Sequence, residues 1–217
     1  MNIKTKSSEI RNKKVVFIDW NKTLCHSLFW SSLQYSNNEY HNTIITWLFK
    51  KNNHIVEAWM RGIFSSEEIC QLISLENDLN EKTVFDSLVK SCTEMSIVDE
   101  DVITDLIRRI KKKGIMVVIA TDNMDTFKRF TLPSLTLTSL FDDILTSNEL
   151  KFFKYESTNH TIPFFSKYLK SNNLSYSDAI LLDDSEDKSG VYDFLGFDIA
   201  IIKNHEDLIK NLKLIAS

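Results

Sequence analysis

The stretch VVFIDWNKTL, residues 15–24, decides the fold of this chain. It begins with four apolar residues, β-branched or aromatic, which is typical of a strand buried on both faces in a parallel sheet. Asp19 follows directly, so its carboxylate is expected at the carboxyl end of that strand, where open α/β sheets bind their ligands. Taken alone, the stretch also fits a core strand that ends in an Asp-initiated turn, and the rest of the chain decides between the two interpretations.

Strands and helices alternate regularly in the second half of the chain. Further apolar strands are expected over 115–120, 143–146, 179–182 and 199–202, with helices over 98–113, 124–130, 163–171, 191–195 and 205–215. Such an alternation indicates a parallel sheet with helices on both faces and right-handed crossovers. The predicted fold class is therefore α/β, a Rossmann-like parallel sheet with a small inserted α-helical cap domain.

The long segment between the first two strands is predicted to be helical throughout. Apolar positions recur at helical spacing over residues 26–95, and Ser65-Ser66-Glu67-Glu68 is typical of a helix start, with a hydroxyl cap and acids in the first turn. We expect a helical cap over 26–95, inserted into a core formed by 13–25 and 96–217. The alternative is that these helices simply cover one face of the sheet.

Composition bounds the class of protein. The 217 residues are 43% hydrophobic and 26% charged, which suits one globular domain with a modest insertion. The net charge of −4 gives no basic footprint for nucleic acid, and no apolar run is long enough to cross a bilayer. The polar segment 1–12 does not resemble a secretory signal. Three widely separated cysteines, Cys25, Cys70 and Cys92, predict reduced thiols and a cytoplasmic location.

Complementary polar groups follow four of the predicted strands. Asp19 ends the first, Thr121 the second and Asp183-Asp184 the fourth, while the third runs into SNELKFFKYE, which contains Lys151 and Lys154. Carboxylates together with phosphate oxygens are the ligands that Mg²⁺ prefers, and a metal ion and a lysine neutralise charge on a phosphoryl group. An Asp carboxylate is also a known nucleophile that forms an aspartyl-phosphate. The strand ends therefore predict a phosphate and Mg²⁺ site.

These strand ends, taken in order, resemble the motifs of the haloacid dehalogenase (HAD) superfamily. The family's first motif, an apolar strand followed by Asp-x-Asp-x-Thr-Leu, stands here as VVFIDWNKTL, and the second, a strand ending in Thr or Ser, as VVIAT. The third, a lysine, stands in SNELKFFK, and the fourth, a strand ending in an acid pair, in ILLDDSED. The resemblance covers residue 15 to the C-terminus, and the helical insertion is similar to the cap of one subfamily, placed between motifs one and two.

The resemblance implies a role for each matching residue. Asp19 corresponds to the nucleophile and a Mg²⁺ ligand, Asn21 to a ligand through its backbone carbonyl, and Lys154, with Lys151 as the fallback, to the motif lysine. Phosphate binding is expected from Thr121, Asp122, Asn123 and Lys154, metal binding from Asp19, Asn21, Asp183 and Asp184, and catalysis from Asp19, Asn21, Thr121 and Lys154. Asp187 is interpreted as a helix-start acid rather than a ligand. The implied partner is a small phosphorylated substrate, bound by a monomer or homodimer that binds neither nucleic acid nor a membrane.

The sequence departs from the family at Asn21. Phosphatases of the family have at this position an acid that shuttles protons, and an amide cannot serve as a carboxylic acid. Lys22 also stands where the family often has Gly, and His26 is a candidate replacement shuttle, with a solvated hinge residue as the alternative. Three functions stay open: a slow or selective Mg²⁺-dependent phosphohydrolase, a catalytically impaired module that binds Mg²⁺ and a phosphorylated ligand, and a dehalogenase-like carbon-centred hydrolase.

Overall fold

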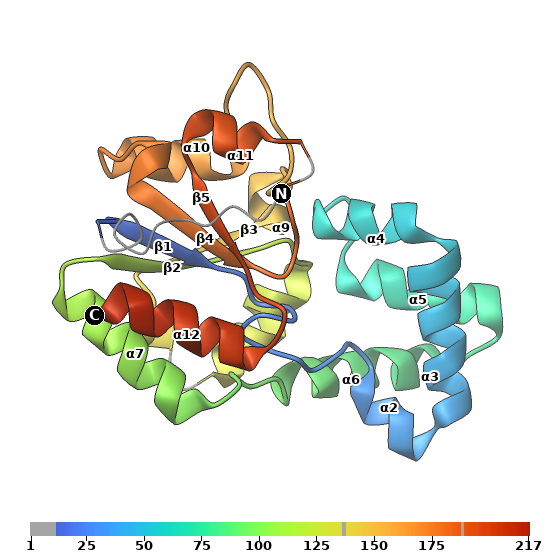
Figure 1. Cartoon of the computed structure of the whole chain (residues 1–217). Coiled ribbons are helices and arrows are strands. Elements are labelled where there is room, and N and C mark those ends of the chain that lie inside the picture. Colours follow the sequence, from blue (N-terminus) through green and yellow to red (C-terminus); the bar gives the residue numbers. More distant parts are fainter. Residues whose placement is uncertain (1–11, 136–137, 188) are drawn as a thin grey trace.

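A five-stranded parallel sheet forms the centre of the computed structural model, which describes residues 12–135, 138–187 and 189–217 (Figure 1). The predicted polar segment 1–12 lies outside the described residues except for its last residue. The strands stand in the order β3-β2-β1-β4-β5, and they comprise β1 Val15–Ile18, β2 Met116–Thr121, β3 Asp143–Thr146, β4 Ala179–Asp183 and β5 Asp198–Ile201. All strand pairs are parallel, so the predicted α/β fold class is confirmed.

Strand β1 lies between β2 and β4 because its side chains are apolar on both faces. Val16 and Ile18 pack into one hydrophobic cluster, and Val15 and Phe17 pack into the other. The first cluster also takes residues from α7 (Glu100–Lys112) and α12 (His205–Ala216), which Figure 1 shows together beneath the sheet. The second takes residues from α10 (Pro163–Ser171) and α11 (Val191–Leu195), above it.

The segment after β2 differs from the single helix predicted over 124–130. It runs as a π-helical turn over Phe127–Thr131 and then as a short α-helix, α8, over Leu132–Ser134. Pro133 lies in the first turn of α8, where its missing N–H costs no helical hydrogen bond. The helical segment ends one residue after this proline, at Ser134. A 3₁₀ turn over Thr138–Leu140, the short helix α9 (Ser147–Leu150) after β3 and a 3₁₀ turn over Tyr176–Asp178 complete the sheet-bearing part.

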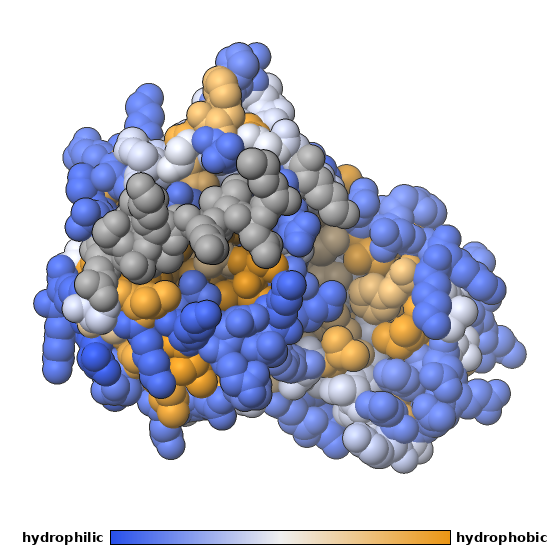
Figure 2. Space-filling view, in the orientation of Figure 1, coloured by the Kyte–Doolittle hydropathy of each residue, from blue (hydrophilic) through white to orange (hydrophobic). Residues whose placement is uncertain are grey.

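A separate group of helices lies to one side of the sheet (Figure 1). It comprises α2 Ser31–Ser36, α3 Asn38–Ile45, a π-helical segment Thr46–Lys51, α4 Asn53–Met60, α5 Ser66–Asn77 and α6 Glu81–Thr93. We call Ser31–Thr93 the cap. Its helices enclose their own apolar cluster around the fully buried Trp30 and Trp59. Figure 2 shows apolar side chains on the side of the cap that faces the sheet-bearing part and a mostly hydrophilic outer side.

Local signals in the sequence explain where the cap helices begin. The Ser65 hydroxyl accepts a hydrogen bond from the N–H of Glu68, and the Glu68 carboxylate accepts one from the N–H of Ser65. This capping box fixes the start of α5, as the hydroxyl and acid pattern predicts. Among the described residues, no helix combines the length and the apolar character that crossing a bilayer requires.

Candidate active site

Three neighbouring strands deliver the polar groups of the site to one edge of the sheet. Asp19 directly follows β1, Asp183 ends β4, and Thr121 ends β2, and β1 lies between the other two. The N–H of Asp19 donates to the carbonyl of Leu182 (2.9 Å), so the ladder between β1 and β4 continues into the site. The strand ends therefore meet because the sheet is parallel and the three strands adjoin.

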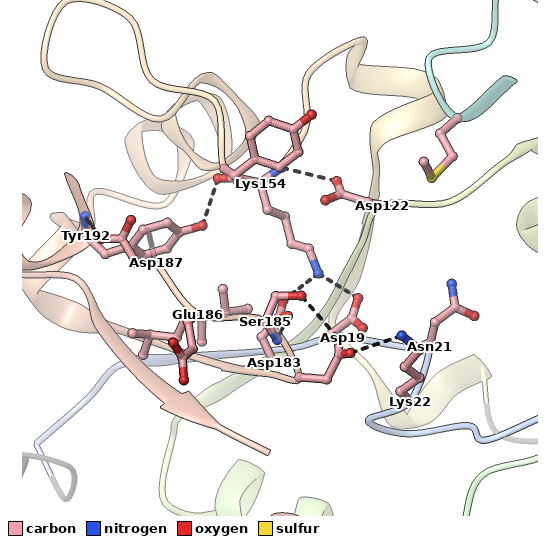
Figure 3. Close-up of a pocket in the computed structure, with 15 residues that line it drawn as sticks. Asp19, Asn21, Lys22, Asp122, Lys154, Asp183, Ser185, Glu186, Asp187 and Tyr192 are labelled. Carbon is pink, nitrogen blue, oxygen red and sulfur yellow. Dashed lines mark hydrogen bonds and ion pairs between the residues drawn. The ribbon is translucent and has the colours of Figure 1, made fainter. Parts of the chain in front are cut away.

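Lys154 joins the two carboxylates at the centre of this edge (Figure 3). Its Nζ donates to Oδ1 of Asp19 (2.6 Å) and to Oδ2 of Asp183 (2.5 Å), and all three side chains are buried. The Tyr192 hydroxyl donates to the Lys154 carbonyl (2.8 Å), and the Lys154 N–H donates to Oδ1 of Asp122 (3.1 Å). The lysine is thus held at its backbone as well as at its ammonium group.

Lys151, the fallback for the motif lysine, points elsewhere. Its Nζ lies 3.5 Å from the carbonyl of Gly62 in the cap, and its own carbonyl accepts a hydrogen bond from Arg61 (2.8 Å). Lys151 therefore belongs to the contact between cap and sheet, while Lys154 belongs to the site. The reason lies in the backbone, because Lys151 has a positive φ of 65° that ends α9 and turns the chain.

Burial and charge shape the protonation of this cluster. Burial raises the pKa of Asp19 to about 7, because desolvation and the neighbouring Asp183 outweigh the attraction of Lys154. Burial by itself would lower the pKa of Lys154, but the carboxylates of Asp19, Asp183 and Asp122 raise it well above its ordinary value. The lysine therefore stays charged, and Asp19 needs further positive charge to be fully ionised at neutral pH.

The carboxylates offer a set of ligands for a divalent cation. Carboxylate oxygens of Asp19, Asp183 and Asp184 all lie within 4.8 Å of one another. Hard oxygen donors in this number suit Mg²⁺, which takes one or two carboxylates and fills its other positions with water and substrate oxygens. Asp184 is half-buried, and the exposed Lys22 ammonium lies 3.6 Å from its Oδ2. The donor set fits the predicted cofactor.

Asn21 and Lys22 form the turn after β1. The N–H of Lys22 donates to the carbonyl of Cys25 (2.7 Å), and Lys22 has a φ of 59°, a left-handed conformation that explains the glycine frequent at this position in the resembled family. Asn21 lines the same cavity as Asp19 and Asp184. The turn thus brings the amide that replaces the usual acid to the site.

Two predicted phosphate-binding residues stand beside the cavity without lining it. Thr121 is fully buried, and its Oγ1 has no hydrogen-bond partner in the described part of the chain. The Asn123 side chain instead accepts from the N–H of Met124 (2.9 Å), and its backbone N–H donates to the Ser147 hydroxyl (3.0 Å). Asn123 therefore holds the loop after β2.

Two further residues singled out in the sequence stand apart from the chemistry. His26 is exposed and is not among the residues that line the cavity, which agrees with a hinge residue. The carboxylate of Asp187 accepts from the backbone N–H groups of Ser189, Gly190 and Tyr192 at 2.9, 3.0 and 2.9 Å. Asp187 therefore organises the start of α11, although it borders the cavity.

The cavity over this edge measures about 370 Å³, and the residues that line it include Asp19, Asp122, Lys154 and Asp183 (Figure 3). Several of its lining residues were not predicted from the sequence, among them Met60 from the cap, Tyr155 after the motif lysine, and Tyr192. Their contribution depends on how the cap meets the sheet and on the path of the loop after α9. Of these residues, only Met60 could have been suspected from the sequence, because it lies at the end of a cap helix, two residues before Gly62.

Comparison with known proteins bears on the fold. No protein-family model matches the sequence, and no curated protein matches it. The structure is similar to that of a predicted HAD-like family hydrolase from Porphyromonas gingivalis, with a TM-score of 0.67 and 16% identity over 93% of this chain and 97% of that one. The chain has the HAD fold.

Other HAD structures extend this likeness. A HAD family enzyme from Bacteroides thetaiotaomicron in complex with magnesium and inorganic phosphate gives a TM-score of 0.61 and 13% identity, over 87% of this chain and 93% of that one. The L-2-haloacid dehalogenase from Xanthobacter autotrophicus with chloropropionic acid covalently bound gives 0.60 and 11%, over 88% and 77%. The HAD fold thus covers both the sheet and the cap of this chain.

Proposed function

We propose that this chain is a Mg²⁺-dependent phosphohydrolase that acts on a small phosphorylated compound through an aspartyl-phosphate on Asp19. The observation that carries the proposal is the buried Lys154, which bridges Asp19 and Asp183 beside a third carboxylate, Asp184. This arrangement combines a nucleophile, a fixed cation and ligands for a metal ion. The magnesium and phosphate complex of the structurally similar HAD family enzyme from Bacteroides thetaiotaomicron supports it.

Each residue contributes a distinct part of the chemistry. A carboxylate oxygen of Asp19 attacks the phosphorus, and the Lys154 ammonium stabilises negative charge on the phosphoryl group. The Thr121 hydroxyl, which has no hydrogen-bond partner in the described part of the chain, would donate to a phosphoryl oxygen that reaches the end of β2. Asp19, Asp183 and Asp184 would hold Mg²⁺, which supplies positive charge for the transferring group. Met60 brings the cap to the cavity, and closure of the cap over a bound substrate would exclude water.

A second function is favoured by one observation, the amide at Asn21. Without an acid at this position the site keeps its phosphate and metal groups but lacks the usual proton shuttle, which is worth about 10² to 10⁴ in rate. The chain would then bind Mg²⁺ and a phosphorylated ligand or partner without turning it over. The third reading, a carbon-centred dehalogenase, needs no metal, so the three clustered carboxylates argue against it.

The test is turnover of p-nitrophenyl phosphate and acetyl phosphate with Mg²⁺ and with EDTA. Both substrates have good leaving groups, so a missing proton donor matters least for them. We expect Mg²⁺-dependent turnover that Asp19→Asn abolishes, since that variant loses the nucleophile but keeps the size of the side chain. Absence of turnover in a native protein that still binds Mg²⁺ and phosphate would favour the binding module.

A further inference from the structure

We infer that Asp122 is the general acid and base of this site, in place of the acid that Asn21 has displaced. The inference rests on the proposed phosphohydrolase function and names the residue that supplies its protons. Asp122 directly follows β2, so its carboxyl group comes from a different strand than the displaced acid of the first motif. It would protonate the leaving group of a phosphate monoester.

The position of Asp122 fits this role. It lines the same cavity as Asp19 and Asn21, and Figure 3 shows its carboxyl group directed from the end of β2 toward Lys154. Its Oδ1 accepts from the backbone N–H of Lys154 (3.1 Å). No donor among residues 12–135, 138–187 and 189–217 reaches the other oxygen, Oδ2. One oxygen therefore anchors the group and the other is free to carry a proton to the cavity.

The surroundings of Asp122 also keep it protonated more readily than an ordinary Asp. Burial raises the pKa of Asp122 to about 6; the charges of Asp183 and Glu156 add to this effect, and Lys154 opposes it. An ionised carboxylate beside a phosphate monoester would repel it, whereas a protonated one donates a hydrogen bond. A group that titrates near neutral pH is suited to both giving and taking a proton.

The proton transfers balance over the two half-reactions. In the first, an oxygen of Asp19 forms a bond to phosphorus, the bond from phosphorus to the ester oxygen breaks with its electron pair, and that oxygen takes the proton of Asp122. The products are an alcohol, the aspartyl-phosphate and an ionised Asp122. In the second, water attacks phosphorus and gives a proton to Asp122, and the bond to Asp19 breaks, which releases inorganic phosphate and restores both side chains.

Other titratable groups near the site are less suited to this task. His26 is exposed and does not line the cavity. Asp187 is taken up by three backbone N–H groups at the start of α11. Asp183 and Asp184 belong to the cation-ligand set, and Asp183 is bonded to Lys154. Asp122 combines a place in the cavity with an unengaged carboxyl oxygen.

The test compares Asp122→Asn with the native protein on p-nitrophenyl phosphate and on phenyl phosphate, whose leaving group is the stronger base. Asn keeps an oxygen that accepts from the Lys154 N–H, so a purely structural role predicts little change on either substrate. We expect a loss of about 10²-fold in kcat on phenyl phosphate and a far smaller loss on p-nitrophenyl phosphate. The decline in the phenyl phosphate rate as pH rises above the pKa of Asp122 should disappear in the variant.

A rescue experiment separates proton transfer from positioning. Adding Asn21→Asp to Asp122→Asn restores an acid at the other position and should recover at least tenfold of the lost phenyl phosphate rate. Equal losses on both substrates, no loss, or no recovery would overturn the assignment of Asp122 while native turnover still supports the phosphohydrolase. A native protein without Mg²⁺-dependent turnover of either substrate would overturn the function and this assignment together.

Discussion

At the scale of single residues, the site places more negative than positive charge in a buried space. Asp19, Asp183 and Asp122 surround one buried cation, Lys154. Carboxylates packed in this way are costly to ionise without a further cation. The repulsion among these carboxylates therefore lowers the stability of the folded protein, and this loss of stability can be measured.

The first prediction concerns the pH dependence of stability in EDTA. The pKa of Asp19 is raised from 3.8 to about 7 on folding, so the folded state holds a proton between these values that the unfolded state has lost. The stability of the native protein should therefore fall as pH rises from about 4 to 7, by on the order of 3 kcal/mol from this group. Asp19→Asn lacks the titrating group, so its thermal midpoint relative to the native protein should rise over this range.

Thermal melts at several pH values, with both proteins in the same buffers, check this prediction. Asp105→Asn is a suitable control because Asp105 is exposed on α7, pairs with Arg109 (3.9 Å) and is not among the residues that line the cavity. A constant difference between the thermal midpoints of Asp19→Asn and the native protein from acid to neutral pH would contradict the cost assigned to Asp19.

The second prediction concerns Lys22. Its ammonium lies 3.6 Å from Oδ2 of Asp184, one of the three carboxylates that can hold Mg²⁺. The Lys22 ammonium competes with Mg²⁺ for the charge of Asp184. Opposite charges at this distance in a solvated site attract by about 1 kcal/mol, which corresponds to about a fivefold change in the affinity for the metal ion. Lys22→Gln should therefore raise the affinity for Mg²⁺ several-fold in calorimetric titrations. The matched control, Lys82→Gln on the cap surface, should leave it unchanged, and a weaker affinity in Lys22→Gln would refute the idea.

At the scale of elements, one side chain from the sheet-bearing part holds two cap helices. Asp125, at the start of the helical segment after β2, accepts from Nε1 of Trp59 (2.8 Å) at the end of α4 and from the Ser66 hydroxyl (2.6 Å) and N–H (3.2 Å) at the start of α5. Arg129 donates to it as well (2.6 Å). The cap is thus tied to the start of the helical segment that follows β2.

The third prediction follows from this contact. Asp125→Ala leaves the buried Trp59 N–H and the Ser66 hydroxyl unpaired, and an unsatisfied buried donor costs about 1 to 3 kcal/mol. We expect a loss of roughly 2 kcal/mol or more in urea-induced unfolding, with earlier proteolysis in the cap. Asp86→Ala breaks the exposed ion pair with Lys82 and should cost less than about 1 kcal/mol. Equal stability of the two variants would show that Asp125 does not tie the cap.

At the scale of the whole molecule, all three cysteines lie within packed regions. Cys25 packs in the cluster beneath the sheet, and Cys70 and Cys92 pack in the cap cluster. Burial raises the pKa of each thiol, that of Cys92 to about 12. Since the thiolate is the reactive form, none of the three is set up for redox or nucleophilic chemistry in the folded protein.

The fourth prediction is the outcome of thiol titration. The thiols of the native protein should react negligibly with a disulfide reagent on a time scale of minutes. In urea, all three thiols of each chain should react. The protein in urea serves as its own control because only burial differs. Rapid stoichiometric labelling of even one thiol in the native state would show that a packed region opens.

The sequence by itself determined the strands, their parallel pairing and the residues at their ends. The run VVFI is buried between two neighbouring strands and two layers of helices, as an apolar run within a strand-helix alternation predicts, and its end places Asp19 at the binding edge. The capping box at Ser65 was also predictable, because all the residues that form it lie within four positions of the chain.

Only the tertiary structure decided which side chains reach the cavity. The sequence favoured Lys154 and kept Lys151 as the fallback, and the left-handed turn at Lys151 directs the two ammonium groups to different places. Likewise, Asn123 turns to its own loop while its neighbour Asp122 enters the cavity. Side-chain direction in loops depends on hydrogen bonds with distant segments, here with Ser147 and Lys154. The spacing of residues along the chain does not predict those contacts.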